Sequence, residues 1–189
     1  MPTFDKSAAA RAVETMGFSA NNRRFAQYWL SAWKNGAPPT RGDLSPAKIK
    51  DLLPGLAILE FDGKDSTICR LAGSAIPMAV GLDPTGLDIV VLTPVQYREE
   101  RVARYRKVAG GAISRCVRRV MNRYDQAFLL EDVQLPLSGG ANGAAAILYH
   151  ADWRPETMDR TTPEILRGLG MVVQEAVTIV VPEQMRAAG

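Results

Sequence analysis

Residues 126–153 read QAFLLEDVQLPLSGGANGAAAILYHADW, two apolar runs on either side of a glycine-rich segment. In each run the apolar residues occupy alternate positions, the pattern of a strand with one buried face. These positions are Leu129, Val133, Leu135 and Leu137 in the first run and Ile147, Tyr149, Ala151 and Trp153 in the second. Segment 138–143 carries three glycines and an asparagine, which favours a hairpin turn. The stretch therefore predicts two neighbouring antiparallel strands.

Upstream of this hairpin, the sequence predicts a second hairpin and then helices. Apolar runs at 56–61 and 67–72 flank the turn Asp62-Gly63-Lys64-Asp65. Segment 73–92 contains too many glycines and prolines for one long helix, so we expect short helical turns. A longer helix follows, starting at Thr93-Pro94 and ending at Gly110-Gly111. Segment 112–122 fits both a helical stripe and a β-branched strand, and periodicity alone leaves the choice open.

The two ends of the chain carry additional elements. Two helices are expected at the N-terminus, one at 8–16 capped by Ser7 and one opening at Ser19 and closing near residue 35. The second presents an apolar face of Phe25, Trp29 and Trp33. This face either folds back on the chain's own sheet or pairs with a second copy, and we expect the homodimer. The tail from residue 162 fits a helix or a strand.

The order of these elements resembles a PAS domain, and most specifically the small bacterial family in which such a domain stands almost alone. The residues that carry the resemblance are Trp33, segment 38–46, Leu52-Leu53-Pro54, segments 69–74 and 81–86, and Leu135-Pro136-Leu137-Ser138. The resemblance implies an α+β fold, with a five-stranded antiparallel sheet, helices on one face and an N-terminal helical extension. It also implies that 112–122 is a strand. The corresponding divisions are 1–37, 38–155 and 156–189.

The resemblance further implies a sensory or interaction module rather than an enzyme. Such a module binds a small ligand between sheet and helices and relays the change to a signalling partner protein. The residues expected to contact the ligand are Arg70, Gly73, Ser74, Gly86, Tyr97, Arg101, Tyr105 and Tyr149. Arg70 stands out because an arginine on an apolar strand needs a ligand anion or an internal ion pair, and both alternatives remain open.

Catalytic and metal-binding constellations are scarce in this sequence. His150 is the single histidine, and we expect it to be solvated or simply hydrogen-bonded, so no metal site is predicted. Neither haem nor flavin is expected, although the sequence does not determine whether another cofactor binds. Glu131-Asp132 is interpreted as an exposed strand position, and Cys69 and Cys116 as buried, reduced thiols.

Charge is the remaining clue to a partner. The net charge of the chain is only +3, but segment 97–123 holds nine Lys and Arg residues against two Glu. A solvated surface explains such a stretch, and the alternative function is a nucleic-acid or nucleotide-binding protein that uses it. No named nucleic-acid motif accompanies it, so we consider nucleic acid the less favoured partner. No signal sequence or membrane span is recognised, and a cytoplasmic location is expected.

Overall fold

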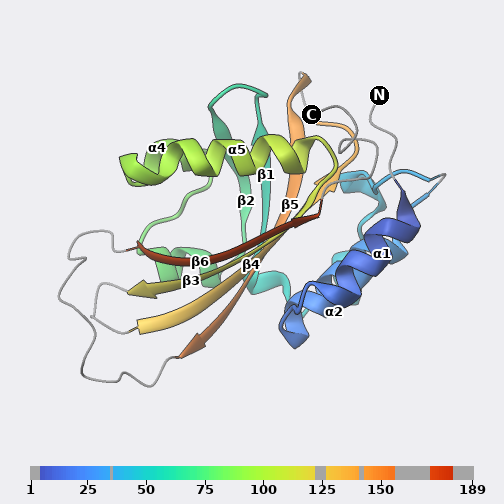
Figure 1. Cartoon of the computed structure of the whole chain (residues 1–189), viewed down its shortest axis with the longest axis horizontal. Coiled ribbons are helices and arrows are strands. Elements are labelled where there is room, and N and C mark those ends of the chain that lie inside the picture. Colours follow the sequence, from blue (N-terminus) through green and yellow to red (C-terminus); the bar gives the residue numbers. More distant parts are fainter. Residues whose placement is uncertain (1–4, 35, 122–126, 141–142, 156–170, 181–189) are drawn as a thin grey trace.

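The computed structural model describes residues 5–34, 36–121, 127–140, 143–155 and 171–180, and it is built around one antiparallel sheet (Figure 1). The spatial order of its six strands is β2-β1-β5-β4-β3-β6. The strands are β1 Leu56–Phe61, β2 Thr67–Ala72, β3 Ile113–Met121, β4 Ala127–Leu137, β5 Ala145–Pro155 and β6 Met171–Val180. Both predicted hairpins are present, since β1 pairs with β2 and β4 with β5.

The helices lie close to where capping residues and helix breakers predict them, except that the longer helix begins at Arg98 rather than at Thr93-Pro94. They are α1 Lys6–Thr15, α2 Ala20–Ser31, α3 Ala75–Val80, α4 Ile89–Leu92 and α5 Arg98–Ala109, with 3₁₀ turns η1 Arg41–Asp43, η2 Pro46–Ile49, η3 Leu53–Gly55 and η4 Val95–Tyr97. The Ser19 hydroxyl caps α2, as expected, by accepting from the backbone N–H of Asn22. The cap of α1 is Asp5 rather than Ser7, because the Asp5 carboxylate accepts from the backbone N–H groups of Ser7 and Ala8.

Helices cover both faces of the sheet (Figure 1). We call the face toward α3, α4 and α5 the inner face and the face toward α1 and α2 the outer face. The inner-face core includes Ala57, Leu59, Phe61, Cys69, Val102, Val108 and Ile147. The outer-face core includes Val13, Phe25, Trp29, Ile58, Ile113, Val133, Leu135 and Leu148. The N-terminal extension therefore completes a second core on the face opposite α5.

The two segments that periodicity left open are both strands. Segment 112–122 contains β3, as the resemblance implied, and β3 lies between β4 and β6. In the tail, residues 171–180 form β6, which pairs antiparallel with β3 from Ile113↔Val180 onward. A helix is therefore excluded for 171–180, where β-branched valines and an available sheet edge favour a strand. Segments 156–170 and 181–189 of the tail lie outside the described residues.

The expected dimer face of α2 is corrected by the structure. Phe25, Trp29 and Trp33 are 0%, 1% and 8% exposed and pack on the chain's own sheet. The Trp29 indole Nε1–H donates to the backbone oxygen of Pro136 at 2.8 Å, which fixes α2 against β4. The outer face of the sheet is apolar, so packing α2 on it buries apolar surface of both. The helix therefore packs on its own sheet rather than on a second copy of the chain. The three residues thus form part of the monomer's core.

Candidate ligand-binding site

Polar side chains gather on the inner face of β3, β4 and β5, where an apolar core would be the ordinary arrangement. The strand register places them in three rows across the sheet. The rows are Ser114–Gln134–Tyr149, Cys116–Asp132–Ala151 and Arg118–Leu130–Trp153. Ser114, Cys116, Arg118, Asp132 and Gln134 are all buried. Polar groups are expensive to bury without partners, so their pairing indicates what this region does.

Helix α5 covers these rows with three more polar side chains. Arg101, Arg104 and Tyr105 lie three and four residues apart, so they occupy one side of the helix. Tyr105 and Arg104 are buried, whereas Arg101 is partly buried. Helix α5 packs on strands β3, β4 and β5, and the pKa of Arg101 is lowered mainly by burial, with smaller effects from Tyr105, Arg118, Arg104 and Asp132. We call Arg101, Arg104, Tyr105, Arg118, Asp132, Gln134 and Tyr149 the inner cluster.

One buried ion pair lies within the inner cluster. Arg118 Nη2 lies 2.8 Å from Asp132 Oδ2, and Gln134 Nε2 donates to the other carboxylate oxygen at 3.0 Å. Arg118 Nε also donates to the Cys116 sulfur at 3.0 Å. Burial by itself lowers the pKa of Arg118, but the nearby negative charge of Asp132 outweighs it and raises the pKa above its usual value. Arg118 and Asp132 thus neutralise each other.

Arg101 and Arg104 of α5 have no carboxylate partner of this kind among the described residues. Arg101 Nη1 donates to the Thr93 hydroxyl at 2.8 Å, a neutral partner, and burial lowers the pKa of this guanidinium. Arg104 is 4% exposed, and its Nε and Nη1 atoms have no hydrogen-bond partner among the described residues. A buried guanidinium without an acceptor is strongly unfavourable. Two positive charges are therefore uncompensated beneath α5 within the described part of the chain.

Three neutral groups on the same face also lack partners among the described residues. They are the Ser114 hydroxyl, the Gln134 amide oxygen and the Trp153 indole N–H. Tyr149 lies beside Gln134 in the strand register, and burial raises the pKa of its phenol, so this side chain stays a neutral hydroxyl. Together these side chains supply a donor from Trp153, an acceptor from Gln134 and the hydroxyls of Ser114 and Tyr149. Such groups are suited to binding a polar molecule.

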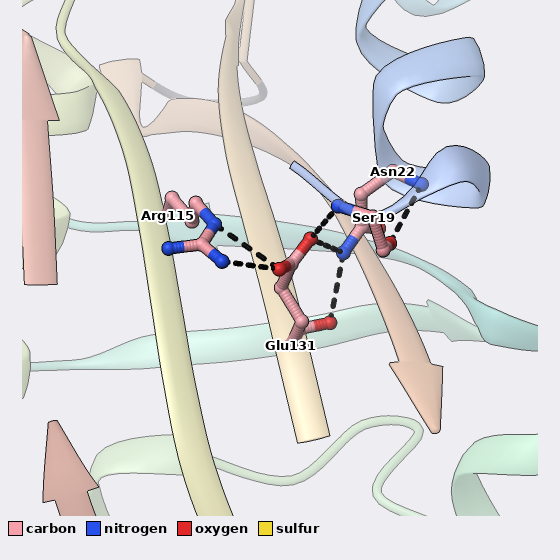
Figure 2. A network of polar contacts seen from close by, with 4 residues as sticks. All are labelled: Ser19, Asn22, Arg115 and Glu131. Atoms are coloured by element: carbon pink, nitrogen blue, oxygen red, sulfur yellow. Dashed lines mark hydrogen bonds and ion pairs between the residues drawn. The ribbon is translucent and has the colours of Figure 1, made fainter. Parts of the chain in front are cut away.

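A separate polar network on the outer face joins α2 to the sheet (Figure 2). The buried Glu131 carboxylate accepts from the Ser19 backbone N–H at 2.7 Å and from Asn22 Nδ2 at 2.9 Å through one oxygen. Its other oxygen accepts from Arg115 Nε at 3.1 Å and Nη2 at 2.7 Å. These contacts of the Glu131 carboxylate are charge-assisted, so the first turn of α2 is held firmly to β4.

His150 extends this network. Its Nδ1 lies 2.7 Å from the Asn22 side-chain oxygen, and its ring stacks on Phe25 with centroids 4.7 Å apart. Because the Asn22 amide nitrogen faces Glu131, its oxygen faces the histidine, and Nδ1 carries the hydrogen. Burial lowers the pKa of His150 to about 4. The histidine is hydrogen-bonded, as one interpretation of the sequence held, but it is not solvated.

The structure brings together three of the eight expected ligand residues, namely Arg101, Tyr105 and Tyr149. Arg70 lies apart from them, with its side chain 48% exposed and its Nε 2.6 Å from Glu60, so it forms the ion pair that was the alternative. Gly73 packs against the backbone of Leu53 and Pro54, where a Cβ would lie 2.0 Å from the Leu53 oxygen. Its role is close packing.

The remaining three expected residues lie in turns or beside the ends of helices. Gly86 has a φ of +83°, and its N–H donates to the Cys69 oxygen at 2.7 Å, so a left-handed turn requires this glycine. Ser74 is exposed just before α3, and Tyr97 is half-buried one turn before Arg101. None of the three is part of the inner cluster as we define it.

Within its described residues, the basic segment 97–123 does not form a continuous solvated basic surface. Arg101, Arg104 and Arg118 point into the molecule, and Arg115 pairs with Glu131. Only Arg106 and Lys107 are exposed among the basic residues whose side chains the structure describes, while Arg123 and the side chain of Arg119 lie outside that description. Its arginines lie mainly on the two faces of the sheet and in the interior beneath α5, where they contact other side chains rather than solvent.

Sequence reasoning missed the carboxylates that organise both networks. Glu131-Asp132 was interpreted as exposed, but both residues are buried because helices cover both faces. A signal was present: Glu131 shares the parity of Leu129, Val133 and Leu135, which places it on a buried face. Arg104 and Arg118 were noted only as part of the basic stretch. Their burial follows from the packing of α5 on β3, which the local pattern does not show.

Other expectations about the chemistry can be compared with the structure directly. Cys69 and Cys116 are buried and neither forms a disulfide, as predicted. The described residues contain no group of three or more His, Cys, Asp or Glu side chains arranged to hold a metal ion. Within the same described ranges, no helix combines the length and apolarity that crossing a membrane requires.

Comparison with known proteins agrees with the architecture. A PAS domain family model matches residues 18–141, a stretch that begins just before α2 and ends after β4. A search of curated proteins found no match. The matched stretch covers more than half of the chain and contains α5 and strands β1 to β4. The chain therefore belongs to the PAS domain family, whose members are sensory and interaction modules.

Proposed function

We propose that this PAS domain is a sensory module, not a catalyst, that binds a small molecule between α5 and strands β3–β5. The observation that carries the proposal is Arg104, a buried guanidinium whose Nε and Nη1 lack an acceptor among the described residues. Folding such a group into the interior costs several kcal/mol unless something supplies the missing hydrogen bonds. A ligand with a negatively charged acceptor supplies them.

The other groups of the inner face suit the remainder of such a ligand. Gln134 offers an acceptor and Trp153 a donor, and the Ser114 hydroxyl acts as either. The apolar side chains Leu59, Phe61 and Ile147 lie on the same face of the sheet. Small-molecule sites commonly combine a few such polar groups with an apolar wall. Tyr105 and Tyr149, both expected from the sequence, belong to this group.

We propose that the bound state is relayed to a signalling partner through β4 and α2. Asp132 pairs with Arg118 on the inner face, and its neighbour Glu131 holds Ser19, Asn22 and Arg115 on the outer face. A ligand that draws Gln134, whose Nε2 donates to Asp132, moves the backbone of β4, and Glu131 carries that movement to the start of α2. A partner protein that contacts the N-terminal helices then responds to whether a ligand occupies the inner face.

Native mass spectrometry tests the binding proposal with the small-molecule filtrate of a cell extract as the probe. The wild-type chain should acquire a defined mass increment, and Arg104→Gln should lose it. Arg106→Gln is the matched control, because Arg106 lies on the same helix but is exposed and donates to the Lys64 backbone oxygen. Circular dichroism of all three proteins verifies that the fold is retained.

Two outcomes contradict the proposal. One is a wild-type chain that acquires no increment from the filtrate or from the cells in which it was made. The other is an increment that Arg104→Gln and wild type carry equally, which places the molecule elsewhere.

A further inference from the structure

We infer that the ligand of the inner cluster is a small dianion, of the dicarboxylate or phosphate type. This inference rests on the proposed function and specifies its chemistry. It is drawn from the charges beneath α5, from their spacing along the helix, and from the partners that each guanidinium already has.

The charges that need a partner belong to Arg101 and Arg104. Arg118 is neutralised by Asp132, with Nη2 and Oδ2 2.8 Å apart, and so makes no demand on the ligand. Arg101 has only the neutral Thr93 hydroxyl, and Arg104 has no acceptor for Nε or Nη1 among the described residues. A neutral ligand leaves two positive charges in a region of low polarisability, and a monoanion leaves one. A dianion leaves none.

The spacing of the two arginines also favours two negative charges held close together. Residues three apart on a helix have Cβ atoms about 5 to 6 Å apart, so both guanidiniums reach one small molecule. Burial lowers the pKa of Arg101, and the nearby positive charges of Arg118 and Arg104 lower it further, so an anion bound here removes part of that repulsion. Guanidinium groups match both carboxylate and phosphate oxygens in geometry.

Neutral groups at the same place set the polarity of the rest of the ligand. The Gln134 amide oxygen accepts and needs a donor, and Gln134 is joined to Asp132 through its Nε2. A ligand hydroxyl, or a protonated oxygen of a phosphate, meets that need.

Thermal unfolding in defined anions tests the inference. The wild-type chain is unfolded in malonate, succinate or phosphate, and in acetate or chloride at matched ionic strength. We expect each effective dianion to raise the Tm by several degrees beyond the monoanions, in a saturable manner. Comparing the two dicarboxylates with phosphate tells which kind of oxygen group the site prefers. Arg106→Gln should keep the whole effect.

The variants separate binding from folding. Arg101→Gln and Arg104→Gln should each lose most of the dianion effect, while the Tm of Arg104→Gln in chloride should equal or exceed that of wild type, because an unpaired buried charge has been removed. A dianion effect that is no larger than that of acetate overturns the inference, as does an effect that survives in both variants.

Failure of this inference is distinguishable from failure of the proposed function. If native mass spectrometry finds a neutral or singly charged molecule that depends on Arg104, the ligand site stands and the dianion is wrong. If no molecule binds in an Arg104-dependent manner, both fall together.

Discussion

At the scale of single residues, the chain is organised by two neighbouring carboxylates that face opposite ways. Glu131 is buried on the outer face and Asp132 on the inner face, and each meets an arginine from β3. Alternation along a strand is the reason, since successive side chains point to opposite faces of a sheet. Each carboxylate is buried at a large desolvation cost, and only its own set of donors makes that burial tolerable.

Removing the Glu131 carboxylate should destabilise the fold strongly. Glu131→Ala leaves Arg115 and Asn22 without their acceptor in a buried setting, for which we expect a loss of about 3 to 5 kcal/mol in the free energy of unfolding. Urea denaturation followed by circular dichroism measures it. Arg70→Gln breaks the exposed Arg70–Glu60 pair and should change stability by less than about 1 kcal/mol. Equal losses in the two variants would show that Glu131 is not a structural anchor.

His150 should make stability depend on pH between about 4 and 6.5. Burial lowers its pKa from 6.5 to about 4 in the folded state, so the unfolded chain binds more protons in this window. The stabilisation is therefore complete above pH 6.5 and is lost progressively as the pH falls to about 4, by roughly 3 kcal/mol in total. His150→Gln should flatten this part of the profile. A slope that is identical in the variant would assign the effect to other groups.

At the scale of elements, helix α2 is held by two different kinds of contact. Its N-terminus is fixed by the Ser19 cap and the Glu131 network, and its body by the apolar side chains Phe25 and Trp29. Trp29 also meets Trp33 edge to face, with ring centroids 5.0 Å apart. Polar contacts at one end fix the position of the helix, while the apolar contacts supply most of the stabilisation.

Truncating Trp29 should therefore cost more than any exposed substitution on the same helix. Trp29→Ala removes a buried ring and its hydrogen bond to the Pro136 oxygen, and we expect a loss of about 3 to 5 kcal/mol in the free energy of unfolding. Gln27→Ala, on the exposed side of α2, should stay within about 0.5 kcal/mol of wild type. If Trp29→Ala were as stable as Gln27→Ala, α2 would not be part of the core.

Helix α5 differs from α2 because it brings charge to the sheet together with apolar cover. Val102, Tyr105 and Val108 pack into the inner-face core, while Arg101 and Arg104 come from the same helix toward the polar rows of β3 and β4. An arginine at a buried position of a helix stabilises nothing by itself. We therefore interpret the arginines of α5 as residues that lower the stability of the fold and bind the ligand.

At the scale of the whole molecule, the order of the elements was predictable and the distribution of the charges was not. The apolar run of β1, the alternation in β4 and β5, the glycines and prolines at the turns, and the Ser19 cap predicted most of the elements correctly. Periodicity left β3 open, because residues on both faces of this strand are covered and its sequence therefore lacks a simple alternation. The resemblance to PAS domains resolved it.

The candidate site was predicted only in part for a related reason. Arg101, Tyr105 and Tyr149 were expected because the resemblance places ligands between helix and sheet. Arg104, Asp132 and Gln134 were not, because their burial depends on which strands lie beneath α5 and on the N-terminal helices that cover the outer face. Charged residues in a segment normally indicate solvent, and only tertiary packing reverses that expectation here.

The measurement that tests the central claim most directly is hydrogen exchange with mass spectrometry, with and without the small-molecule filtrate of a cell extract, on wild type and Arg104→Gln. In wild type, the account predicts slower exchange in α5 and in β3–β5, together with changed exchange at the start of α2, where Ser19 and Asn22 meet Glu131. Arg104→Gln should show none of these changes. Slower exchange confined to other segments, or the same changes in the variant, would contradict the account.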